Sequence, residues 1–360
     1  MPRSKKISVL DTYFILLLSL GITNHVILIP VLLQTAGRDA WMGVILTSFI
    51  QLIWLYIFYL IMKRTNQQSI FSWFKERFGT IIGWIFIIIT TCYFFLLAMI
   101  MLRETTTWIN VTYLPQTPKI FVSIVIVILC VYIAFNGIRS IAIVSGILLP
   151  LVWILGHFVA TTNLQFKDYS LLTPLFVNGY MPTMKTMIVA SGGFMEMIVL
   201  IFFQHHIRRK ISYLHIVLLG LLLAGLTLGP LMGAIANFGP VLAKQYRYPA
   251  FEQWMLVTIT KYITHIDFLA LYQWLAGAVI RIALFLFIIS DSISFKNSSR
   301  RLLFLVLLGA SLSVLSLTPA IDRQIELYVL GNYALACLIF LLSLSLAIFL
   351  ATAFKAKTKR

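Results

Sequence analysis

The chain has 360 residues, of which 61% are hydrophobic and 11% are charged, with a formal net charge of +17 and a mean hydropathy of +0.97. Soluble domains carry about 25% charged residues, so this composition cannot cover a water-exposed surface. It excludes a soluble enzyme or binding domain and predicts one all-α polytopic membrane domain over residues 1–360.

The first expected element is an apolar run over about residues 12–33, preceded by a tail that contains Arg3, Lys5 and Lys6. A signal peptide has a shorter apolar region and a small-residue cleavage site soon after it. Because this run is longer and no such site follows closely, we expect it to be retained as the first membrane span.

Further apolar segments follow along the chain, each about as long as a bilayer crossing requires. Together with the first they cover about residues 12–33, 41–62, 81–102, 120–136, 141–161, 186–204, 213–236, 267–290, 301–318 and 330–353. The connections between them are short. The sequence therefore predicts ten transmembrane helices and no separate soluble domain.

Positive charges are distributed unevenly between alternate connections. If both tails are placed on one side of the membrane, roughly twice as many Lys and Arg residues lie on that side as on the other. The positive-inside rule then places both termini in the cytoplasm. The net charge of +17 is interpreted as a topology signal, with some attraction to anionic lipid head groups. We expect no nucleic-acid-binding face.

Two of the apolar segments contain interruptions. The sixth contains ASGGFMEM at residues 190–197, with two adjacent glycines followed by Glu196, and the first contains SLGITNH at residues 19–25. Transporters built from inverted repeats break corresponding helices in each half and bind ligand there. The pair predicts broken helices 1 and 6 in a five-plus-five inverted repeat, over about residues 12–161 and 186–318 or slightly beyond. The alternative is that the glycines only allow close helix packing.

Glu196 and Arg281 are ionisable residues near the centres of the sixth and eighth segments. An unpaired charge there costs at least about 2.5–3.5 kcal/mol, so each is expected to face a partner or a cavity. One interpretation makes Gly193 the N-cap of a second half-helix, with Glu196 in its first turn. The other makes Glu196 a ligand for a cation, a proton or an amine. Arg281 is expected either to pair with Glu196 or to bind the carboxylate of a ligand.

The other polar residues carry weaker signals. We expect His205 and His206 to belong to a solvated basic loop, and Glu104 and Asp267 to be hydrated near span ends. His25 either is a satisfied helix histidine or lines a cavity. No motif for metal binding, nucleophilic catalysis or phosphate binding is present. The sequence therefore predicts no enzyme, no cofactor and no metal site.

Residues 36–41, AGRDAW, follow Ile29-Pro30 and the interrupted first segment. Together with Arg103 near the end of the third segment and Glu196 after the glycines of the sixth, they resemble the B subunits of bacterial spore germinant receptors. These subunits are relatives of amino acid permeases in the APC superfamily. The resemblance covers nearly the whole chain, and AGRDAW is its most specific part.

The resemblance implies a leucine-transporter-like fold, with a small amino-acid-like germinant bound between helices 1, 3, 6 and 8. The ligand contacts that it implies are Gly21, Thr23, Asn24, Leu97, Gly192, Gly193, Phe194 and Ile280. It also implies that the protein senses the germinant and signals to a receptor A subunit and a lipoprotein C subunit in the spore inner membrane. The alternative is a secondary amino acid transporter, coupled to a cation or a proton.

Overall fold

The structure is a computed structural model that describes residues 6–258, 266–317 and 323–353, with side chains described from residue 334 onward in the last range. The basic tails at 1–5 and 354–360 lie outside the described residues. Within the described ranges the regular structure is helical, and one isolated parallel β-bridge pairs Ile7 with Ile207. The prediction of an all-helical fold is confirmed.

The N-terminal part of the chain supplies α1 to α7. Their bounds, with the short 3-10 and π segments between them, are α1 Val9–Ile22, η1 Thr23–Ile27, α2 Leu28–Ala36, η2 Gly37–Asp39, α3 Ala40–Arg64, α4 Ile70–Phe78, α5 Thr80–Thr112, α6 Lys119–Phe135 and α7 Ile138–Thr162. Two 3-10 segments, η3 Asn163–Phe166 and η4 Tyr169–Leu172, lead to the second part.

The C-terminal part supplies α8 to α14. Their bounds are α8 Met181–Met195, η5 Glu196–Ile198, α9 Val199–Phe203, η6 Gln204–His206, α10 Tyr213–Ala243, α11 Pro249–Met255, α12 Phe268–Ile293, α13 Ser298–Ser316 and α14 Arg323–Ala351. The helix α10 is kinked at Gly239, whose φ of 72° lies in the left-handed region that favours glycine.

Local sequence explains where several of these helices begin and end. Ser8 and Asp11 form a capping box at the start of α1, in which each side chain accepts a hydrogen bond from the other residue's backbone N–H. Gly37 and Gly79 follow α2 and α4 with positive φ values, as is usual after a helix C-terminus.

Eight helical stretches in the described residues are long and apolar enough to cross a membrane. The first, Val9–Arg64, is 56 residues long and contains α1, α2 and α3, and the apolar helix α6 has 17 residues. Apolar side chains cover much of the outside, for example Ile53 at 71% and Ile81 at 78% exposure. Such a surface suits lipid rather than water, so the protein is a multi-pass membrane protein.

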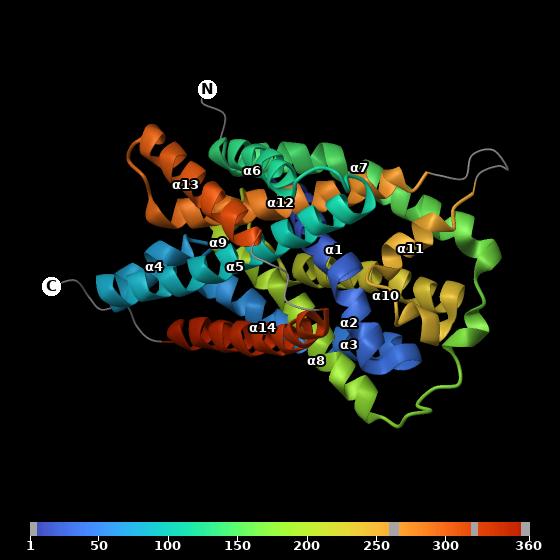
Figure 1. The fold of residues 1–360 in the computed structure, drawn as a ribbon. Helices are drawn as coiled ribbons and strands as arrows, with labels where there is room; N and C mark the ends of the chain where they lie inside the picture. Colours follow the sequence, from blue (N-terminus) through green and yellow to red (C-terminus); the bar gives the residue numbers. More distant parts are fainter. Residues whose placement is uncertain (1–5, 259–265, 318–322, 354–360) are drawn as a thin grey trace.

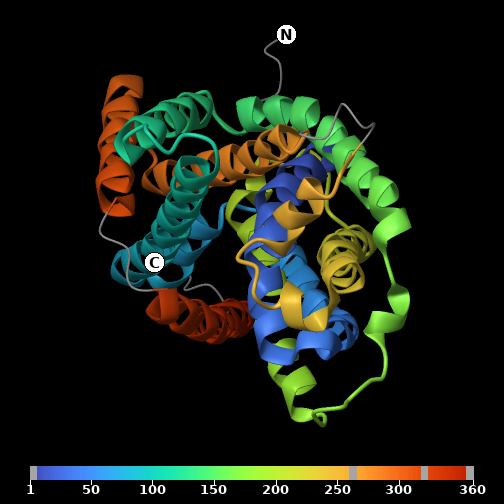
Figure 2. The same ribbon diagram turned by 45° about the vertical axis from the view of Figure 1, so that its right-hand side comes forward.

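Two groups of helices meet at the centre of the bundle (Figures 1 and 2). The helix α12 contacts α1, α5, α6 and α7, whereas α8 contacts α2, α3 and α14. In Figure 1, α12 (orange) runs between α5 and α6, and α14 (red) lies beside α8. The helix α1 touches both α12 and η5, so it joins the two groups.

The buried apolar residues divide into two clusters, and the boundary between the clusters crosses both interrupted segments. On the first apolar segment Val26 belongs to the larger cluster and Leu28 to the smaller one. On the sixth segment the change falls between Phe194 and Met195. These two positions coincide with η1 and with the start of η5, so the irregular turns lie where the apolar core is interrupted.

Candidate ligand site at the interrupted helices

The first apolar segment is interrupted by a π-helical turn and not by an unwound stretch. Residues Thr23–Ile27 form η1, and its flanking residues Ile22 and Leu28 both have right-handed helical backbone angles. The Asn24 side chain is fully buried and donates from Nδ2 to the Leu20 carbonyl at 2.9 Å. A π turn widens the helix locally and is frequent at functional sites.

The helix of the sixth segment tightens to a 3-10 turn at the corresponding place. The helix α8 ends at Met195, and Glu196–Ile198 form the 3-10 turn η5 before α9 begins at Val199. Glu196 itself has right-handed helical angles, with φ −60° and ψ −14°. Both interruptions therefore keep the backbone helical, because unpaired N–H and C=O groups are too costly in a membrane interior.

The structure corrects the expected helix start at Gly193. That residue lies inside α8, two residues before its end, and so is not an N-cap for a second half-helix. A β-carbon at Gly193 would lie 2.9 Å from Asn24 Oδ1, and one at Gly192 would lie 2.6 Å from the Ala334 carbonyl oxygen. The glycines therefore allow close packing against η1 and α14, which is the alternative interpretation of the pair.

Glu196 and Arg281 lie together in the centre of the bundle. Arg281 Nη2 is 2.8 Å from Glu196 Oε2, and the two side chains are only 3% and 4% exposed. Arg281 Nη1 also donates to the Ser19 carbonyl at 3.0 Å. The pair thus connects α12, η5 and α1, and each buried charge is neutralised by the other.

The guanidinium of Arg281 also lies 4.8 Å from the centre of the Phe285 ring, one helical turn further along α12. Planar guanidinium groups stack well on aromatic faces. With Glu196, the Ser19 carbonyl and this ring as neighbours, Arg281 is held in one position.

The residues implied as ligand contacts are all at least partly buried, but they fall into separate surroundings. Asn24 and Gly193 face each other, and Gly21 faces Leu226 of α10. Leu97 and Ile280 belong to the larger apolar cluster and Phe194 to the smaller one. Among the described residues, Asn24 Oδ1 and Ser19 Oγ are buried oxygen atoms without a hydrogen-bond partner. Two polar acceptors are therefore free at the level of the interruptions.

A small hollow lies away from this level, at the end of the bundle near the N-terminus. Its lining consists of Val9, Thr12, Tyr13, Leu200, Ile211, His215, Ile216 and Leu219. The implied ligand contacts do not line it.

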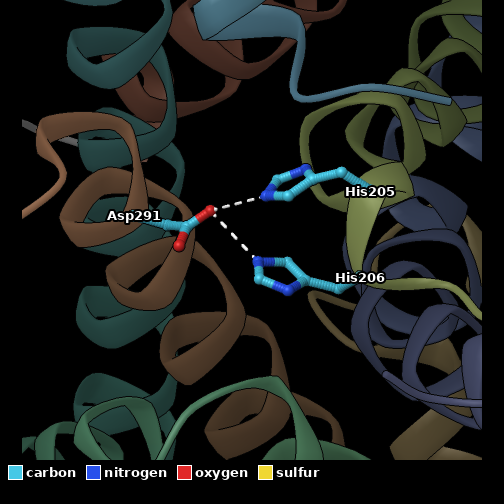
Figure 3. Close-up of side chains that lie close together, drawn as sticks. All are labelled: His205, His206 and Asp291. Atoms are coloured by element: carbon cyan, nitrogen blue, oxygen red, sulfur yellow. Dashed lines mark hydrogen bonds and ion pairs between the residues drawn. The ribbon is translucent and has the colours of Figure 1, made fainter. Parts of the chain in front are cut away.

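His205 and His206 are corrected from members of a solvated loop to members of a polar cluster (Figure 3). His205 Nε2 and His206 Nε2 lie 3.0 and 3.1 Å from the same oxygen, Asp291 Oδ2. The three side chains are 21–26% exposed. Sequence reasoning missed the cluster because Asp291 lies 85 residues beyond His206 and was placed at the edge of a connection. The adjacent histidines beside the end of an apolar segment were the available signal.

Glu104 also differs from expectation, because it is buried rather than hydrated. Its side chain accepts a hydrogen bond from the Tyr248 hydroxyl at 2.8 Å and forms an ion pair with Arg247 at 3.4 Å. Burial, and secondarily the Glu104 carboxylate, raises the pKa of Tyr248 well above its usual value. Trp274 packs edge-on against the Tyr248 ring and donates to Thr105, the neighbour of Glu104. This contact attaches the α10–α11 connection to α5.

The fold and its buried polar level define a polytopic α-helical membrane protein. Residues 6–323 match the family model described as spore germination protein, and the chain belongs to this family. It is 41% identical to spore germination protein XB of Bacillus anthracis over 310 residues, which cover 86% of this chain and 87% of that protein. The resemblance to spore germination proteins is therefore confirmed.

Two relatives from Bacillus subtilis (strain 168) are more distant. The putative spore germination protein YfkT is 27% identical over 78% of this chain and 76% of its own length. Spore germination protein KB is 23% identical over 79% of this chain and 78% of its own length. These relatives are described as germination proteins.

Proposed function

We propose that this protein is the germinant-sensing membrane subunit of a spore nutrient receptor. It binds a small amino-acid-like ligand at the level of η1 and η5 and transmits binding to partner subunits. The observation that carries the proposal is the buried polar level between the two apolar clusters, where Asn24, Gly193 and the Glu196–Arg281 pair lie. Membership of the spore germination family supports the biological setting.

The chemistry of this level suits a zwitterionic ligand. Asn24 Oδ1 and Ser19 Oγ are acceptors of the kind that an ammonium group requires, and both are buried without a partner among the described residues. Arg281 supplies a guanidinium that can share its donors between Glu196 and a ligand carboxylate. Ligand binding then favours an arrangement in which the two apolar clusters have moved apart at their boundary.

Architecture and placement belong to the same proposal. We infer ten membrane crossings in a leucine-transporter-like inverted repeat, since an irregular turn occurs in the first segment of each half. Both termini are cytoplasmic, so the His205–His206–Asp291 cluster faces the cytoplasm or spore core. The partners are a larger A subunit and a lipoprotein C subunit in the spore inner membrane.

The binding test uses the purified full-length chain in lipid nanodiscs, titrated with each common amino acid and monitored by calorimetry. One or a few amino acids are expected to bind. Asn24→Ala should weaken binding roughly tenfold or more, because it removes an acceptor for a charged group. Asn136→Ala, an exposed asparagine at the end of α6, is the matched control and should bind as the wild type does. Equal binding by the Asn24 variant would contradict the proposed site.

A second experiment separates sensing from transport, the alternative function. Proteoliposomes that contain the purified chain are tested for net uptake of the bound amino acid, and spores that lack the gene are tested for germination on it. Loss of germination without any uptake activity supports a sensor. Ion-driven net uptake by the purified chain would instead show a secondary transporter.

A further inference from the structure

His205, His206 and Asp291 present three ligand atoms to one point (Figure 3). Within the described ranges, these histidine and carboxylate atoms all lie within 4.8 Å of one another. Both imidazoles approach Asp291 Oδ2, at 3.0 and 3.1 Å. Ligand atoms bound about 2.0–2.1 Å from a tetrahedral zinc ion lie roughly 3.3 Å apart. The two Nε2–Oδ2 distances of 3.0 and 3.1 Å are therefore already close to those of neighbouring ligand atoms around such an ion.

The backbone around the two histidines is held in place before any ion binds. His206 ends the 3-10 turn η6, and its carbonyl accepts from Ile7 N at 2.9 Å. Arg208 N then donates to the Ile7 carbonyl at 2.9 Å, which completes the parallel bridge. On the other side Asp291 lies near the end of α12, a long helix packed in the bundle. The ligands therefore come from two fixed elements, which reduces the entropy lost on binding.

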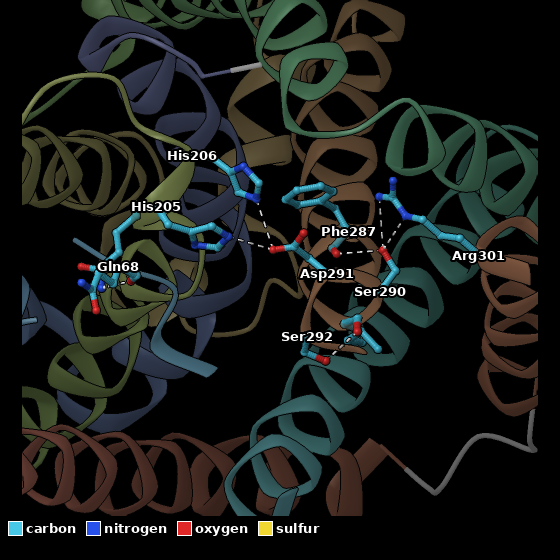
Figure 4. A network of polar contacts seen from close by, with 10 residues as sticks. Gln68, His205, His206, Phe287, Ser290, Asp291, Ser292 and Arg301 are labelled. Carbon is cyan, nitrogen blue, oxygen red and sulfur yellow. Dashed lines mark hydrogen bonds and ion pairs between the residues drawn. The ribbon is translucent and has the colours of Figure 1, made fainter. Parts of the chain in front are cut away.

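Neighbouring charges leave the carboxylate available (Figure 4). Arg301 of α13 is close enough to Asp291 for an electrostatic interaction, but its hydrogen bonds go to Ser290 Oγ at 3.4 Å and to the Ala134 carbonyl at 3.2 Å. The His206 ring packs against Phe287 with centroids 5.3 Å apart, which restrains its orientation. The side chains keep 21–26% exposure, so an ion can reach them from solvent.

We propose that His205 Nε2, His206 Nε2 and Asp291 Oδ2 form a binding site for a divalent transition metal ion, with Zn²⁺ as the reference ion. Two imidazole nitrogens and one carboxylate oxygen suit Zn²⁺ and its transition-metal neighbours, whereas Mg²⁺ and Ca²⁺ prefer all-oxygen sites. Water completes the coordination, as in three-ligand zinc sites. Each imidazole would bind the ion as the neutral tautomer, through an unprotonated Nε2 with the ring proton on Nδ1.

Binding at this site has a mechanical consequence. The ion would connect the end of the sixth apolar segment to the end of α12, the helix that also carries Arg281. The Glu196–Arg281 ion pair joins these two segments at the central level, and the metal ion would join them at the end of the bundle. An occupied metal site would therefore resist separation of the two segments. Only this consequence for signalling rests on the proposed function. The binding site itself does not.

The test uses the full-length chain, purified in detergent through an affinity tag without histidines and stripped of metal. Co²⁺ is titrated in, because its visible absorption reports coordination number, and Zn²⁺ is then added as competitor. We expect one Co²⁺ per chain with the absorption of a four- or five-coordinate site, displaced by Zn²⁺ and unaffected by excess Mg²⁺ or Ca²⁺. Zn²⁺ should also raise the unfolding temperature of the wild type.

The variants His205→Gln and His206→Gln keep an N–H group that can donate to Asp291 but lose the metal-binding nitrogen. Each should weaken Co²⁺ binding at least roughly tenfold while its unfolding temperature in metal-free buffer stays close to the wild-type value. His157→Ala, an exposed histidine on α7, is the matched control and should bind as the wild type does.

Two results would overturn the proposal. The first is a wild-type protein that does not give the visible absorption of four- or five-coordinate Co²⁺. This includes the case in which a lower pH, but no metal ion, raises the unfolding temperature, because the histidines would then bind protons and not a metal ion. The second is undiminished binding in both glutamine variants, which would place the ion elsewhere. Both results are independent of whether an amino acid binds at the central level.

Discussion

The ion pair between Glu196 and Arg281 is the contact whose removal should have the largest and most diagnostic effect. The two atoms are 2.8 Å apart and the side chains are almost completely buried. Removing one partner of such a pair leaves an uncompensated buried charge and costs about 3–5 kcal/mol. With an unfolding entropy of about 2.1 cal/mol/K per residue, that loss lowers the unfolding temperature of a chain of this length by about 4–7 °C.

The two single substitutions should not be equivalent. A carboxyl group that has lost its partner can become neutral by taking up a proton, whereas a guanidinium cannot lose one in a protein. We therefore expect Glu196→Gln to be more harmful than Arg281→Gln. The double substitution removes both charges, so its loss should be smaller than the sum of the two single losses by about 2 kcal/mol or more.

Thermal unfolding in detergent can be monitored with a thiol-reactive fluorophore, because the side chains of Cys130 and Cys337 are buried and become accessible to the reagent only on unfolding. Cys92 is exposed and supplies the baseline. Matched controls are Glu76→Gln and Arg139→Gln, which change exposed charges and should shift the transition by less than about 1 °C. Additive losses in the double variant would refute direct coupling of the pair.

Three further outcomes follow from the described contacts. Gly193→Leu should abolish the response to ligand while membrane insertion is retained, because its side chain would fill the space taken by Asn24; a normal germination response would contradict a site at this level. Gly192→Ala should lower the unfolding temperature, because its β-carbon would meet a backbone oxygen at 2.6 Å, whereas the control Gly225→Ala, with open space around it, should leave stability unchanged or raise it by about 0.5–1 kcal/mol. Because the pKa of Tyr248 is raised in the folded state, the protonated phenol contributes to folding stability below about pH 10, and this contribution is lost as the pH rises further. The unfolding temperature should therefore fall more steeply above that pH in the wild type than in Tyr248→Phe. Identical pH profiles for the two proteins would exclude the contribution.

The sequence predicted those features that a membrane interior requires of any chain, namely long apolar helices and paired buried charges. Long apolar runs identified the helices, since a bilayer interior demands satisfied backbone groups over a fixed length. The same reasoning required a partner for each buried charge, and the structure brings Glu196 and Arg281 together across 85 residues of sequence. Composition therefore predicts a helical membrane protein, and the two charges inside apolar segments predict an ion pair, without any knowledge of how the helices pack.

Backbone detail at the interruptions could not be obtained in this way. Residues 19–25 and 190–197 combine glycines with polar groups, a pattern that indicates an unwound helix as readily as a close contact. The structure contains a π turn and a 3-10 turn instead, because small changes in helical hydrogen bonding cost less than exposed backbone groups. Which of these forms depends on neighbours such as Asn24 and Ala334, and these are distant in sequence from the glycines that they contact.

The β-bridge between Ile7 and Ile207 gives the N-terminal segment an experimental use. Since its two hydrogen bonds join Ile7 to His206, the last residue of η6, and to Arg208 just beyond it, a displacement of that helix end would carry Ile7 with it. A fluorophore or spin label attached ahead of Ile7 would then report rearrangement of the sixth segment in an otherwise unmodified bundle. Distance changes from such a label to a fixed point on α13 would record each conformational state as nutrient or metal is added.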